Sequence, residues 1–60
     1  MQLIHKGYKG NAVYDDYDKL YVGNVLEIPE IVYYEGKNPI ELNKSFREAV
    51  ERYIELKNRL

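Results

Sequence analysis

The C-terminal third of this 60-residue chain carries apolar side chains at helical spacing, and this pattern constrains the fold most. Side chains three and four residues apart lie on the same side of a helix, so they form one continuous stripe. The stripe consists of Leu42, Phe46, Ala49, Val50, Tyr53, Leu56 and Leu60. Charged residues occupy most other positions, which is typical of a solvated helix face. The sequence therefore predicts one amphipathic helix, roughly 39–58, that must bury one face.

The start of this helix is marked by Asn38, Pro39 and Glu41. An asparagine at the N-cap accepts a free backbone N–H, and a proline at the first helical position has no N–H to satisfy. A glutamate at the third position can reach back to the cap. These three residues predict that the helix begins at position 39.

The preceding residues form short runs rich in β-branched and aromatic side chains, which are typical of strands. We expect strands over 11–14, 20–26 and 31–35. The turn formers of 15–19 suit a hairpin loop, and Pro29 marks 27–30 as a connector because proline cannot donate to a strand ladder. An extended piece at 3–5 is expected to prolong the first strand past Gly7 and Gly10, with a bend or bulge between.

These elements predict a single α+β domain, residues 1–60, built as an antiparallel three-stranded meander followed by one amphipathic helix packed on one face (β-β-β-α). The expected core is Val13, Val22, Val25, Leu42, Phe46, Ala49, Val50 and Tyr53. Both alternating faces of the second and third strands are apolar, yet one helix covers only one face. Seven tyrosines also favour an interface. We therefore expect a partner or a second copy on the open face, unless a missing segment or a crossing loop covers it.

Composition argues against several classes of protein. The chain has no cysteine, so it has neither disulfides nor thiolate metal sites, and small chains of this kind often oligomerise. Nine basic and ten acidic residues lack the basic excess of nucleic-acid-binding modules. No apolar run approaches the roughly 18 residues of a membrane span, and no secretory signal is present, so a cytoplasmic protein is expected. His5 and Ser45 are the only histidine and serine and lie far apart in sequence, so no catalytic site is expected.

Several segments, in order, carry a family pattern: Lys6-Gly7-Tyr8-Lys9-Gly10, Val13-Tyr14-Asp15, Tyr21-Val22-Gly23-Asn24-Val25, Tyr33-Tyr34-Glu35-Gly36, and Glu41-Leu42 followed by Phe46-Arg47-Glu48-Ala49-Val50-Glu51-Arg52-Tyr53. Their order and spacing are similar to the K-G-Y-x-G, F-x-G-x-V, F-E-G and E-L…F-x-E-A-V-x-x-Y run of HicB N-terminal domains. The resemblance covers residues 6 to about 54. The chain therefore resembles the HicB-like antitoxin family.

The resemblance implies a non-enzymatic, cofactor-free antitoxin with a partial RNase H-like fold. Such a protein neutralises a HicA-like toxin, a small basic mRNA-cleaving enzyme, by covering its RNA-binding surface and active site. HicB relatives usually continue into a C-terminal DNA-binding domain, and these 60 residues contain none, which argues against DNA binding by this chain. The alternative is a stand-alone homo-oligomeric domain of the same fold without a toxin partner.

Carboxylates outside the helix are the candidates for contact with a basic toxin, because they would stand where RNA phosphates bind. With one tyrosine as an apolar anchor, the candidate partner-binding set is Asp15, Asp16, Asp18, Glu27, Glu30, Tyr33 and Glu35. The alternative for the carboxylates is that they form turns and solubilise loops.

Three other sites receive less support from the sequence. The acidic run at 15–18 lacks the glycine and the distal glutamate of a calcium loop, so no metal site is expected. His5 has no evident metal-binding companions and is expected to be structural. Lys6 and Lys9 flank Tyr8, which suggests a nucleic-acid patch, but two lysines do not make a basic face.

Overall fold

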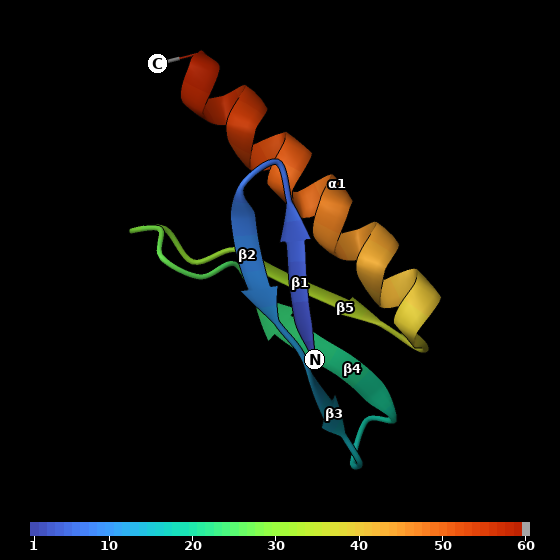
Figure 1. The fold of residues 1–60 in the computed structure, drawn as a ribbon. Helices are drawn as coiled ribbons and strands as arrows, with labels where there is room; N and C mark the ends of the chain where they lie inside the picture. Colours follow the sequence, from blue (N-terminus) through green and yellow to red (C-terminus); the bar gives the residue numbers. More distant parts are fainter. Residues whose placement is uncertain (60) are drawn as a thin grey trace.

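The computed structural model describes residues 1–59, which form five strands and one helix (Figure 1). The strands are β1 (Gln2–His5), β2 (Tyr8–Asn11), β3 (Val13–Asp15), β4 (Leu20–Asn24) and β5 (Tyr33–Gly36), and the helix is α1 (Pro39–Asn58). Strands β3, β4 and β5 form an antiparallel meander, and α1 packs mainly against β5. The predicted α+β fold, a three-stranded meander followed by one helix, is confirmed.

The N-terminal residues form a hairpin of their own. The prediction that residues 3–5 prolong the first strand is wrong, because β1 folds back and pairs antiparallel with β2. The two-residue turn between them consists of Lys6 and Gly7, with φ of 51° and 83°. Positive φ at both positions is the type I′ geometry that matches the natural twist of a hairpin, and glycine adopts it without steric cost.

The first predicted strand, 11–14, is not continuous, because β2 ends at Asn11, β3 begins at Val13, and Ala12 lies between them. Both pieces still pair with the β4 segment, because Gly10 bridges Val25 and Val13 pairs with Val22. At the break, the Asn11 side chain accepts the backbone N–H of Asn24 at 2.9 Å, which replaces a ladder bond. Gly23 is required opposite this break, since a Cβ there would lie 1.9 Å from the Asn11 carbonyl oxygen.

The helix has the bounds that the sequence predicts. Asn38 caps it by accepting the N–H of Glu41 at 2.8 Å, and the Glu41 carboxylate accepts the N–H of Lys37 at 3.3 Å. The glutamate thus reaches back one residue beyond the cap. Ser45 accepts the N–H of Glu35 at 3.4 Å and so ties the helix to the free edge of β5. Local capping signals therefore account for where the helix begins.

The core lies between α1 and the sheet. Leu42, Phe46 and Val50 are completely buried, and Val25, Ala49 and Tyr53 are also buried, as predicted. Val22 is only half-buried, and the prediction for Val13 is wrong because 64% of that residue is exposed. Two residues outside the predicted core, Ala12 and Tyr34, join it. Leu60 lies outside the described residues.

The third strand begins later than predicted, at Tyr33, although Val32 still accepts the N–H of Val25 at 3.0 Å. The connector before it spans residues 26–32 and contains the proline, as predicted, but it is longer than the predicted 27–30 because the second predicted strand ends earlier than position 26 and the third begins later. Among residues 1–59, no helix combines the length and the apolar character that a bilayer crossing requires.

Candidate functional site

The face of the β3–β4–β5 sheet that points away from α1 is the candidate site, here called the outer face. Directly paired residues of antiparallel strands point to the same face, and neighbours along a strand alternate. Gly23 pairs with Tyr34, whose ring packs on Phe46 of the helix at 5.1 Å between centroids, so this pair defines the inner face. The outer face therefore consists of Val13, Asp15, Leu20, Val22, Asn24, Tyr33 and Glu35.

Large apolar side chains of this region remain exposed to solvent. Tyr33 is 75% exposed and Val13 is 64% exposed, whereas Leu20 and Val22 on the central strand β4 are half-buried. Ile31, two residues before Tyr33, is 74% exposed. A monomeric soluble protein rarely gathers such residues on one side unless they contact something. The exposure agrees with the prediction that both strand faces are apolar while the helix covers one.

Two shallow hollows meet at Tyr33. The first, of about 220 Å³, lies on the outer face over Gly23, and its walls are Asn11, Val13, Val22, Asn24 and Tyr33. The second, of about 160 Å³, lies between the connector and the helix, and its walls are Ile31, Val32, Tyr33, Ala49, Arg52, Tyr53 and Leu56. Tyr33 thus forms the ridge between two apolar depressions. A ridge between two depressions suits the insertion of side chains from a partner protein.

The predicted carboxylates do not form one cluster, because they divide among three places. Asp15 ends β3, Asp16 and Asp18 lie in the turn between β3 and β4, and Glu27 and Glu30 lie in the connector beyond the other end of β4 (Figure 1). Glu35 lies on the outer face itself, in one row with Val22 and Val13. Tyr33 and Glu35 are therefore the two predicted residues that the sheet brings together on the outer face, with Asp15 at its end.

Asp15 shapes the turn that carries its neighbours. Its carboxylate accepts the backbone N–H of Tyr17 at 2.9 Å and that of Asp18 at 3.3 Å. This is the turn-forming role of aspartate, and Lys19 completes the turn with a φ of 58°. Asp16 and Asp18 are exposed and remain candidates for partner contact.

In the connector, Glu30 is engaged with the helix. Its carboxylate accepts the Tyr53 hydroxyl at 2.6 Å. That hydrogen bond lowers the pKa of Glu30 and raises the pKa of Tyr53 to about 12, since it favours the ionised carboxylate and the neutral phenol. Glu27 is exposed and has a φ of 63°. Glu30 therefore fastens the connector to α1, and both Glu27 and Glu30 are exposed to solvent.

The charged residues are unevenly distributed along the chain, and the net charge of the whole chain does not reveal this. Residues 13–35 contain six carboxylates and one lysine, whereas the rest of the chain contains eight lysines and arginines and four glutamates. The sheet and its loops are strongly acidic, the N-terminal hairpin has two lysines and no carboxylate, and α1 has four basic and four acidic residues. This signal was present in the sequence, but it has meaning only once β3, β4 and β5 are known to form one surface.

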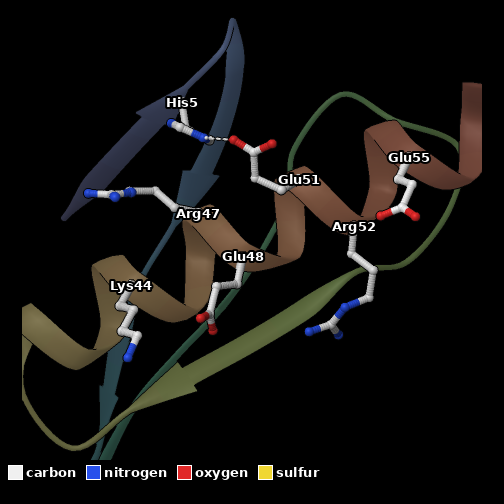
Figure 2. Close-up of a pocket in the computed structure, with 7 residues that line it drawn as sticks. All are labelled: His5, Lys44, Arg47, Glu48, Glu51, Arg52 and Glu55. Carbon is white, nitrogen blue, oxygen red and sulfur yellow. Dashed lines mark hydrogen bonds and ion pairs between the residues drawn. The ribbon is translucent and has the colours of Figure 1, made fainter.

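The exposed face of α1 and strand β1 together form a further depression of about 410 Å³, which is lined by polar side chains (Figure 2). His5 Nε2 lies 2.8 Å from the Glu51 carboxylate, and Lys6 Nζ lies 2.9 Å from it. These contacts lower the pKa of Glu51, with Lys6 the larger cause and His5 the second. Basic and acidic side chains alternate around the depression, so it shows no single charge preference. His5 here ties the hairpin to the helix.

The fold and surface define a small α+β domain with an apolar, acidic outer face. Comparison of the chain with protein-family models, with curated proteins and with solved structures finds no match.

Proposed function

We propose that this protein is a HicB-like antitoxin that binds a HicA-like mRNA-cleaving toxin through the outer face and covers its RNA-binding surface and active site. The observation that carries the proposal is the coincidence of exposed apolar residues and carboxylates on one sheet face. Tyr33, Val13 and Glu35 share this face, and 13–35 has six carboxylates against one lysine. The resemblance of residues 6 to about 54 to HicB N-terminal domains supports the same function.

The charge of the outer face suits an inhibitor of an RNA-binding enzyme. Such an enzyme presents lysines and arginines to phosphates, and carboxylates placed there compete with RNA and accelerate encounter. The apolar residues would then supply the contacts that slow dissociation. The proposed action is therefore occlusion by binding rather than catalysis. His5 pairs with Glu51, and Ser45 accepts the N–H of Glu35.

The second candidate is a stand-alone homo-oligomer, which the exposed residues Val13, Ile31 and Tyr33 would serve as well. A two-fold dimer through the outer face would, however, bring Glu35 and Asp15 of both copies to one interface. Like charges placed together in an interface are unfavourable. The charge of the face therefore favours a basic partner over a second copy.

The test is co-expression of this chain with the small basic protein encoded beside its gene. We expect a stable complex, suppression of RNA cleavage in proportion to the added chain, and weaker association at higher salt because the steering is electrostatic. Absence of a complex, together with a symmetric oligomer by light scattering, would replace the antitoxin with the homo-oligomer.

A further inference from the structure

Tyr33 occupies an unusual position for a side chain of its size. It begins β5, pairs with Asn24 and is 75% exposed, although the next residue, Tyr34, is buried. It also stands between the two apolar hollows, one over Gly23 and one beside α1. Exposed apolar surface therefore continues from Val13 on the outer face, past Tyr33, to Leu56 on the helix.

The backbone hydrogen bonds between the β4 and β5 segments explain why Tyr33 is accessible at the edge of the sheet. The N–H of Val25 donates to the carbonyl of Val32, so Val32 and, by alternation, Tyr34 direct their backbone groups toward β4. Tyr33 and Glu35 consequently direct theirs away from β4, and the N–H of Glu35 indeed meets Ser45 on the helix. Tyr33 is therefore accessible both from the outer face and from the free edge.

Charge identifies the kind of partner that fits. Glu35 follows Tyr33 on the same face and pairs with Val22, a wall of the first hollow. The single lysine of residues 13–35, Lys19, lies in the turn at the far end of β4. Among the described residues, the walls of the first hollow carry no charge, but Glu35 adjoins the wall residue Val22, and Lys19 lies at the other end of β4. Arg52 is a wall of the second hollow. The first hollow therefore favours an apolar residue accompanied by lysine or arginine.

We infer that Tyr33 is the central anchor of the partner interface: it inserts between two apolar side chains of a basic partner protein, one in the hollow over Gly23 and the other in the hollow between Ile31 and Leu56. The inference rests on the proposed function and deepens it, because it names the residue and the two hollows that determine affinity. Glu35 pairs with a cation of the partner next to the first hollow. Interface energy commonly concentrates in a few such aromatic anchors.

The test measures affinity of full-length variants for the neighbouring gene's basic product by titration calorimetry. Tyr33→Ala is expected to weaken binding at least about tenfold, as are Val13→Asp in the first hollow and Leu56→Asp in the second. Ile40→Asp is the matched control, because this residue is 83% exposed and lies outside both hollows. The control is expected to bind within about twofold of the unaltered chain. Thermal melting verifies that each variant is folded.

The outcomes separate this inference from the proposed function. If the unaltered chain forms the complex and suppresses RNA cleavage, but Tyr33→Ala binds equally well, the anchor is wrong and the antitoxin function stands. If only one of Val13→Asp and Leu56→Asp weakens binding, the two-hollow arrangement is wrong. If no complex forms, both proposals fail. If the free chain is a dimer that Tyr33→Ala converts to a monomer, the occupant is a second copy, which also overturns the inference.

Discussion

Tyr33 and Tyr34 are adjacent residues of the same type, yet the two faces of the sheet give them opposite roles. The Tyr34 ring packs on Phe46, and its hydroxyl lies 2.6 Å from the Asn11 carbonyl oxygen and 3.2 Å from that of Asn24. Tyr33 points outward and is 75% exposed. Strand alternation separates the pair, because successive side chains point to opposite faces. The inner face thus holds the fold together, and the outer face is available for binding.

The two faces are expected to differ most in how much the free energy of unfolding changes when one side chain is truncated. Phe46 is completely buried, so Phe46→Ala should lower the free energy of unfolding by about 3–5 kcal/mol. That approaches the entire stability of a domain this small. Val13→Ala on the outer face should change it by no more than about 0.5 kcal/mol. Urea unfolding measures both, and a Phe46→Ala variant as stable as the unaltered chain would contradict the placement of the helix.

A finer contrast comes from deleting a single oxygen atom in each adjacent tyrosine. Tyr34→Phe leaves the carbonyl oxygens at the strand break without their hydroxyl donor, which should cost about 1–3 kcal/mol. Tyr33→Phe removes a hydroxyl for which no hydrogen-bond partner is seen among residues 1–59, so stability should hardly change. Equal effects of the two substitutions in a urea titration would mean that the faces do not differ as described.

The smallest effect expected is a loss of stability at alkaline pH, which is caused by ionisation of Tyr34 and Tyr53. Burial raises the pKa of Tyr34 to about 12, and the hydrogen bond to Glu30 raises that of Tyr53 to about 12. In the unfolded chain both titrate near pH 10, so their stabilising contribution is complete below about pH 10 and is lost as the pH rises toward 12. The melting temperature should therefore be lower at pH 11.5 than at pH 9.

The control for this titration is the double variant Tyr34→Phe/Tyr53→Phe. It is less stable at pH 9, but its melting temperature should change less between the two pH values. An alkaline decrease as large as that of the unaltered chain would show that other groups cause it.

Local sequence signals predicted the helix and the order of the strands but not the N-terminal hairpin. Asn38, Pro39 and Glu41 act within one helical turn, and the structure begins the helix where they indicate. The hairpin was missed because its turn places a lysine, Lys6, at a position with positive φ, where asparagine, aspartate or glycine is the usual signal. The glycine at position 7 was the remaining cue.

The candidate site was only partly predictable for a related reason. Tyr33 and Glu35 belong together because β5 pairs with β4, whereas Asp16 and Glu27 lie at different ends of that strand. Glu30 is a predicted partner-contact residue, and its carboxylate also accepts the hydroxyl of Tyr53, a residue 23 positions away. No local pattern reports such a contact.

The sequence alone determined one capped amphipathic helix, three strands in a meander and a surplus of apolar strand residues. These features arise from interactions within a few residues, so their signals are readable along the chain. Tertiary structure decided that Tyr34 is buried and Tyr33 exposed, that Val13 faces solvent, and that the first strand breaks at Ala12. It also placed Asp15 and Glu35 on the outer face with Val13 and Tyr33. These outcomes depend on which face of the sheet the helix covers, and that is settled by packing between residues distant in sequence.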